Sequence, residues 1–220
     1  HRVRKVSKAS GLISTIAGTG TAGYNGDSIP ATTARLYQPC TVTLDASGNI
    51  YIMDEWNARV RKVDTGGTIT TVAGTGLTTY NGDGISATTA NISSVTIGTL
   101  DASGNLVFTD RDNHRIRRLN VSTGLISTVV GTGSAAYNGD GLPALSANIS
   151  NPTGVVYDAA GNLYLTDYGN NRVRRIDAAT GLISTVAGSG AAGDSPDGTA
   201  ALQANIQTPI GVALDAAGNL

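Results

Sequence analysis

Hydrophobic residues along the chain fall in short runs that turn-forming residues separate. In one stretch the runs cover residues 153–157, 163–167, 172–176 and 182–187. Each run has five or six residues, and its apolar positions are mostly Val, Ile and Leu, which is typical of β-strands. Between the first two runs, Gly and Asn offer the positive φ angles that a tight hairpin needs. The pattern therefore predicts a four-stranded antiparallel meander.

The same pattern recurs along the whole sequence. Three complete units cover residues 51–106, 107–163 and 164–220, and residues 1–50 match the unit without its first seven positions. A lone four-stranded sheet with two apolar faces is not stable in water, so neighbouring copies must cover both faces. Radial stacking meets this requirement. We therefore expect an all-β fold, a single β-propeller array of four-stranded antiparallel blades over residues 1–220.

The ends of the sequence bear on how such a ring could close. Residues 210–214 match a first strand, and residues 1–17 supply a third and a fourth strand, but the second strand of that blade is missing. Closing four blades would leave an exposed strand edge, which invites pairing with another chain or with further repeats. We expect the 220 residues to be part of a longer array with six or more blades.

A segment of constant length joins the fourth strand of each unit to the next first strand. It has 21 residues in every copy, at 19–39, 75–95, 132–152 and 189–209. Constant length in divergent copies favours an ordered, packed segment. We call these segments the inserts and expect each to form a turn and one or two helical turns, with Pro30 and Pro143 near the helix start. Apolar residues near the end of each insert are expected to dock on a blade, namely Leu36, Ile92, Ile149 and Ile206.

Charge and composition exclude several function classes. The formal net charge is −1 and aromatic residues make up 5% of the chain, so a nucleic-acid surface is disfavoured although the third strands are rich in arginine. One Cys and two His leave little for a metal or nucleophile site. No apolar run is long enough to insert into a membrane.

Each unit repeats an acid and a base five residues apart across the turn between its second and third strands. A guanidinium can meet a carboxylate across such a hairpin, so we expect structural ion pairs that fix the register. The expected pairs are Asp54 with Arg59, Asp110 with Arg115, and Asp167 with Arg172. A pair repeated in every unit argues against catalysis, because an active site needs one asymmetric constellation.

The inserts of three units carry the sequence Tyr-Asn-Gly-Asp. The Asp could cap the following helix while the Tyr packs on the blade. Alternatively, these residues and the unique Trp56 could contact a sugar or a protein partner. The candidate contact residues are Tyr24, Asn25, Asp27, Tyr80, Asn81, Asp83, Tyr137, Asn138, Asp140 and Trp56.

The fourth insert departs from this motif. It reads Asp194-Ser-Pro-Asp197 and so loses the Tyr. The two carboxylates are a weak calcium candidate, because calcium takes six to eight oxygen ligands. We expect no other cofactor.

Two motifs in register, Asp167-Tyr-Gly-Asn-Asn-Arg-Val-Arg174 and Asp110-Arg-Asp-Asn-His-Arg-Ile-Arg117, resemble the NHL repeat. Together with the inserts, the chain is similar to the long-period NHL propellers of large secreted bacterial proteins and of the teneurin ectodomain. We expect a non-enzymatic interaction or structural scaffold that binds a protein partner, and the resemblance implies an extracellular or cell-surface placement. A multivalent carbohydrate-binding propeller is the main alternative. An NHL-type lyase and an RNA-binding propeller are further alternatives.

Overall fold

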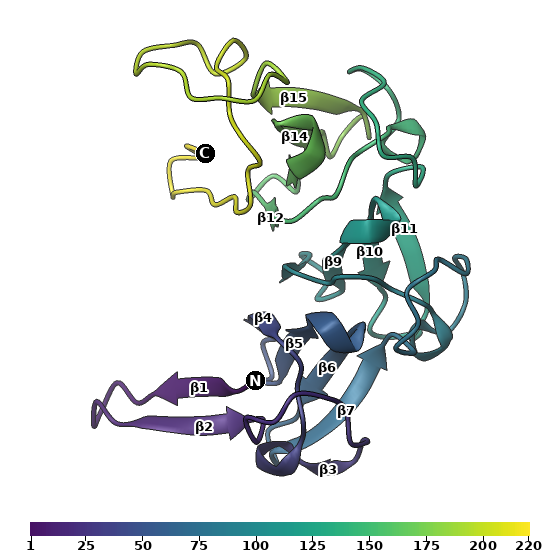
Figure 1. Cartoon of the computed structure of the whole chain (residues 1–220), viewed down its shortest axis with the longest axis vertical. Helices are drawn as coiled ribbons and strands as arrows, with labels where there is room; N and C mark the ends of the chain where they lie inside the picture. Colours follow the sequence, from purple (N-terminus) through teal and green to yellow (C-terminus); the bar gives the residue numbers. More distant parts are fainter.

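Four antiparallel β-sheets follow one another along an open arc, from the purple N-terminal sheet to the green fourth sheet (Figure 1). The computed structural model describes all 220 residues. The two termini lie on the open side of the arc and no sheet joins them. No helical segment is long and apolar enough to cross a membrane.

The sheets have the meander topology that the repeat predicts. The first is a two-stranded sheet of β1 (Val3–Val6) and β2 (Ile13–Ala17). The second contains β4 (Pro39–Leu44), β5 (Ile50–Asp54), β6 (Arg59–Val63) and β7 (Thr68–Ala73). The third contains β8 (Gly98–Leu100), β9 (Leu106–Asp110), β10 (Arg115–Leu119) and β11 (Ile126–Val130). The fourth contains β12 (Val155–Tyr157), β13 (Leu163–Asp167), β14 (Arg172–Ile176) and β15 (Ile183–Ala187).

The fourth sheet tests the strand predictions one by one. Strands β13 and β14 have the predicted bounds, and β15 begins one residue later than predicted. The first strand is shorter than predicted because Thr153 and Gly154 bond irregularly to Thr166. The predicted strand at 210–214 is absent, because no second strand lies beside these residues to pair with them.

Each of the first three inserts links two consecutive blades. It leaves the fourth strand of one blade and reaches the fourth strand of the next, where β3 (Ile29–Pro30) pairs with β7. Single bridges repeat this contact between Ser86 and Leu125 and between Pro143 and Leu182. The insert then runs to the first strand of that same next blade. Each of these three inserts therefore ties one blade to the fourth strand of the next blade.

The helical part of the inserts is at the lower end of the expected one or two turns. Three inserts contain a single 3₁₀ turn of three residues, and the fourth contains none: η1 (Ala31–Thr33), η3 (Ala87–Thr89) and η5 (Ala144–Ser146). In each case the next Ala is extended and its carbonyl accepts a hydrogen bond from the Thr at the start of the insert, as in Thr75 N to Ala90 O at 3.1 Å. This bond ends the helix after one turn.

The hydrophobic core lies between blades. One cluster joins Met53 and Val60 of the second blade to Phe108 and Leu119 of the third, with Ile92 of the insert between them. Similar clusters fill the other two junctions. Leu36, Ile92 and Ile149 are fully buried, as expected, and Ile206 is half-buried. Burial of one such side chain contributes roughly 1.5–3 kcal/mol, so the inserts stabilise every junction.

Candidate functional site

A buried arginine lies at each junction between an insert and the following blade. It is the third residue of the third strand, and its side chain is fully buried in all three complete blades: Arg61, Arg117 and Arg174. Arg117 Nη1 lies 3.1 Å from Asp110 Oδ2 of the second strand, and Arg117 Nη2 lies 2.9 Å from Asp83 Oδ1 of the insert. Each guanidinium is thus held between a blade carboxylate and an insert carboxylate.

The other two junctions repeat the arrangement. Arg174 lies 3.2 Å from Asp167 and 2.9 Å from Asp140. Arg61 lies 3.8 Å from Asp54 and 3.0 Å from Asp27. Each arginine also donates to the carbonyl of the insert Gly that precedes the Asp. We call each such group of one arginine and two aspartates a clamp.

The blade aspartate of each clamp is fully buried. Asp110 accepts hydrogen bonds from the backbone N–H of Ser93 and from Asn113 Nδ2, both at 2.7 Å. Burial raises the pKa of Asp54, Asp110 and Asp167, while these hydrogen bonds and the neighbouring arginine act in the opposite direction. A carboxylate in such a place is stable only while its partners are present.

The predicted ion pairs contain the correct aspartate but the wrong arginine. Arg59 stands opposite Asp54 in the register, but its guanidinium donates to the carbonyls of Asn57 and Thr75 instead. Arg115 and Arg172 do the same in their blades. The aspartate is met diagonally, by the arginine two residues further along the strand.

The tyrosines of the inserts cover these arginines. The Tyr80 ring centre lies 3.8 Å from Arg115 Cζ and 4.9 Å from Arg117 Cζ. Tyr24 and Tyr137 lie over the equivalent arginines at 3.8 to 4.9 Å. Cation–π contacts of this kind contribute about 0.5–2 kcal/mol. One face of each ring is therefore occupied within the chain.

The Asn and Asp of the motif are also engaged internally. Asn81 donates to Thr89 O at 2.9 Å and accepts from the backbone N–H of Asn91 at 2.8 Å. Asn25 and Asn138 make the same two bonds in their inserts. The expected helix cap is wrong, since no side chain caps η1, η3 or η5. Asp27, Asp83 and Asp140 instead pair with the buried arginines of the next blade.

The fourth insert keeps only part of this arrangement. Ser195 stands where the other inserts have Asn, and its Oγ accepts the backbone N–H of Asn205 at 2.8 Å. Asp194 and Asp197 are exposed. No three His, Cys, Asp or Glu side chains in the structure gather as a metal site would require. The calcium candidate therefore has two carboxylates and no third.

Threonines in or just before the first strands link consecutive repeats, a feature that the sequence motifs did not reveal. Thr41 Oγ1 donates to Thr96 O at 2.8 Å, Thr96 Oγ1 donates to Thr153 O at 2.9 Å, and Thr153 Oγ1 donates to Ile210 O at 2.9 Å. The acceptors recur every 57 residues, so the repeat period was the available signal. These bonds hold consecutive blades together near the inside of the arc.

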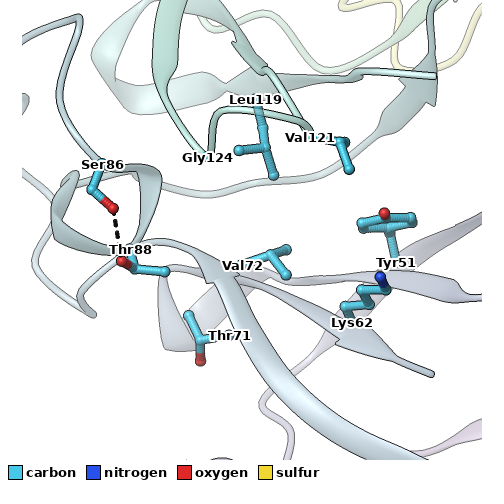
Figure 2. A pocket seen from close by; sticks show the side chains of 9 residues that line it. All are labelled: Tyr51, Lys62, Thr71, Val72, Ser86, Thr88, Leu119, Val121 and Gly124. Atoms are coloured by element: carbon cyan, nitrogen blue, oxygen red, sulfur yellow. Dashed lines mark hydrogen bonds between the residues drawn. The ribbon is translucent and has the colours of Figure 1, made fainter. Parts of the chain in front are cut away.

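A hollow of about 250 Å³ opens between the second and third blades (Figure 2). Val72 and Leu119 form its apolar walls, and Ser86 and Thr88 of the insert close one side. Lys62 is its one charged lining residue. Its lining contains no carboxylate, imidazole or thiol.

The single cysteine gives a test of local electrostatics. Partial burial raises the pKa of the Cys40 thiol to about 12, helped by its hydrogen bond to Glu55 Oε2 at 2.8 Å and by the charge of Glu55. The thiolate is the reactive form, so we expect alkylation by iodoacetamide at pH 8.5 to be at least about tenfold slower than for a peptide thiol. Glu55→Gln should speed the reaction. Alkylation of the parent chain at the peptide rate, followed by mass spectrometry, would contradict this assignment.

Comparison with known proteins finds one repeat motif, one relative in sequence and several structures with a similar fold. Residues 150–176, which contain β12, β13 and β14, match the NHL repeat. The chain is 29% identical over 196 residues to Protein SUPPRESSOR OF QUENCHING 1, chloroplastic, from Arabidopsis thaliana. The match covers 84% of this chain and 18% of that protein.

Solved structures with the same fold include two proteins from Bacteroides thetaiotaomicron. A structural genomics protein of unknown function from Bacteroides thetaiotaomicron matches with a TM-score of 0.63 and 19% identity, over 96% of this chain and 58% of the other. An auxiliary nutrient binding protein from the same organism matches with a TM-score of 0.59 and 19% identity, over 99% of this chain and 60% of the other. The chain thus spans about 60% of these structures and a smaller part of the plant relative. It carries an NHL repeat at residues 150–176 and folds into a series of antiparallel β-propeller blades.

Proposed function

We propose that the chain is a non-enzymatic scaffold, part of a rigid propeller whose inserts present a surface to a protein partner. The proposal rests on one observation: the repeated charged and aromatic residues contact one another inside the molecule. Arg117, Asp110, Asp83 and Tyr80 contact one another across a junction, and their counterparts do so at the other two. Residues that could have served chemistry in every unit therefore serve assembly.

The inserts offer a surface that assembly does not use. Leu145 and Leu202 are 60% and 58% exposed and occupy the same position of consecutive inserts. Thr32 and Thr88 occupy that position in the earlier inserts and are exposed too. Exposed apolar side chains at matching places on a rigid surface suit a protein contact. We place the partner's contact on the inserts of the third and fourth units.

We also place the scaffold outside the cell or at its surface. The resemblance to secreted NHL propellers and a surface rich in Thr, Ser, Gly and Asn but poor in Lys support this placement. The plant relative carries the word chloroplastic in its name, which makes the placement worth a direct test. Protease treatment of intact source cells should digest the protein, and full protection would contradict the placement.

The partner surface is tested with two matched double variants of the complete protein. Affinity purification from source cells should enrich at least one protein about tenfold, and Leu145→Asp with Leu202→Asp should abolish that enrichment. Thr32→Asp with Thr88→Asp adds the same charges at equivalent positions and should leave it unchanged. Equal enrichment with both double variants would contradict the assigned surface. A turnover reaction found with the purified chain would contradict the non-enzymatic role.

A further inference from the structure

The short turn after the second strand is where consecutive blades differ most in chemistry. The turns are η2 (Glu55–Asn57), η4 (Arg111–Asn113) and η6 (Tyr168–Asn170). The last residue is Asn in all three, and it bonds both the buried Asp and a carbonyl of the insert. The first two residues of each turn do not make these two bonds. Residues that differ between repeats can build one asymmetric site, which the repeated clamps cannot.

One polar hollow of about 360 Å³ lies at such a place, between the second and third blades. Turn η2 borders it on one blade and η4 borders it on the next, while the intervening insert lines the space between them. Its principal lining residues are Glu55, Trp56, Thr78, Ser93, Ser94 and Asp112. We call this space the Trp56 hollow. Its volume is in the range of small-molecule sites.

Trp56 gives the hollow an exposed aromatic surface. Trp56 is 59% exposed. Tyr24 and Tyr137 are only 38% exposed, and an arginine guanidinium lies over the ring of each. The Trp56 ring centre lies 5.3 Å from that of Tyr37, and the Trp56 backbone N–H bonds to Tyr37 O at 3.1 Å. The indole therefore contacts the ring of Tyr37 at a tilt of 44°, and most of the residue stays exposed. A fixed, open aromatic face loses little entropy when a ligand stacks on it.

Two carboxylates face the same hollow and are held in place. Asp112 Oδ2 accepts hydrogen bonds from the hydroxyls of Ser93, at 3.0 Å, and Ser94. Glu55 Oε2 accepts from Cys40 at 2.8 Å. Each carboxylate has further lone pairs for hydroxyl donors of a ligand, and the serine oxygens can accept in turn.

Cations next to the hollow offset these acids. Arg111 Nη1 lies 3.6 Å from Asp112 Oδ1. Arg59 lies directly behind Gly76, where a Cβ atom would meet its Nη1 at 2.5 Å. With two acids and two arginines around it, the hollow has no strong potential of either sign. A neutral ligand rich in hydroxyl groups fits this balance better than an organic cation does.

We propose that the Trp56 hollow binds one ring of a neutral saccharide. The apolar face of the sugar lies on the indole of Trp56, and its hydroxyls donate to Asp112 and Glu55. This site is separate from the protein-contact surface on the later inserts. The tyrosines of the inserts are then not the sugar-binding residues, because an arginine already lies over each of their rings.

The sole tryptophan of the sequence gives a direct readout. The complete chain is titrated with maltose, cellobiose, lactose, mannobiose and chitobiose while the fluorescence of Trp56 is recorded. We expect a saturable blue shift with at least one of them and none with choline or arginine methyl ester. Asp112→Asn should weaken binding at least about tenfold, because a sugar hydroxyl loses its charged acceptor. No saturable change with any of the five sugars would overturn the proposal, and so would a response confined to the two cations.

Two further variants separate the site from general effects on folding. Trp56→Ala, followed by saturation-transfer NMR with the best sugar, should abolish binding, whereas Trp56→Phe should keep part of it. Tyr137→Ala removes an aromatic ring at another junction and should leave the affinity unchanged. Circular dichroism confirms that each variant is folded. Undiminished binding by Trp56→Ala, or loss in Tyr137→Ala alone, would overturn the assignment.

Discussion

Replacing Arg117 with Met should lower the free energy of unfolding by about 3–5 kcal/mol. The side chain is fully buried, and its removal leaves Asp110, also fully buried, without its cation. It also frees Asp83 of the insert from the third blade. Guanidinium chloride unfolding followed by circular dichroism measures the loss.

The neighbouring Arg118 provides the control. Arg118 pairs with Asp101 at 3.3 Å, but its side chain is 39% exposed. Pairs near the surface contribute about 0–1 kcal/mol, so Arg118→Met should change the free energy of unfolding by less than about 1 kcal/mol. Equal losses in the two variants would show that burial of the clamp is not what stabilises the junction.

The loss caused by Arg117→Met should depend on pH. Burial already raises the pKa of Asp110 in the folded chain, and removing the arginine raises that pKa further. At pH 7 the carboxylate is left charged without its partner, and as the pH falls it takes up a proton in the folded variant. The difference between variant and parent should therefore shrink from pH 7 toward pH 4. A difference that stays constant over this range would mean that Asp110 does not sense Arg117.

Gly131→Ala should also be strongly destabilising, by about 3 kcal/mol. The φ angle of Gly131 is +101°, and a Cβ atom there would lie 2.4 Å from His114 O and 3.2 Å from Ile149 Cγ1. Backbone strain and overpacking each cost about 1–3 kcal/mol. The glycine lets the fourth strand turn into the insert while touching the third strand. Thermal or denaturant unfolding measures the effect.

Gly124→Ala separates the two contributions. Gly124 has a φ angle of +71°, but nothing lies within 4 Å of the position that a Cβ would take. Its replacement should cost only the backbone strain, about 1 kcal/mol. If Gly124→Ala were as destabilising as Gly131→Ala, close packing at the start of the insert would have no measurable role.

Much of the fold could be predicted from the repeat. Residues 163–167 and 172–176 form strands as predicted, because alternation and turn residues act locally and were visible in the sequence. The unpaired segment 210–214 shows the limit of this reasoning. A strand is stabilised by its neighbour, so its own sequence does not decide whether it forms.

The clamps were predicted only in part, for a geometric reason. Spacing across the hairpin pointed from Asp110 to Arg115, which is its direct partner in the register. Arg117 pairs with Asp110 instead. The guanidinium of Arg115 donates to backbone carbonyls, while that of Arg117 donates to the carbonyl of Gly82 in the insert. The insert Asp precedes that arginine by 34 residues at all three junctions, which was the signal to use. That spacing alone does not show a contact, because pairing across so long a loop depends on how the inserts fold back.

A double-mutant cycle between Asp83 and Arg117 tests most directly whether each insert clamps the blade that follows it. The four proteins are the parent, Asp83→Ala, Arg117→Met and the double variant, and their free energies of unfolding give the coupling. Because Asp83 Oδ1 and Arg117 Nη2 are 2.9 Å apart and the arginine is fully buried, we predict a coupling of about 1 kcal/mol or more. Effects that add within about 0.3 kcal/mol would show that the insert and the blade are energetically independent, which would contradict the account.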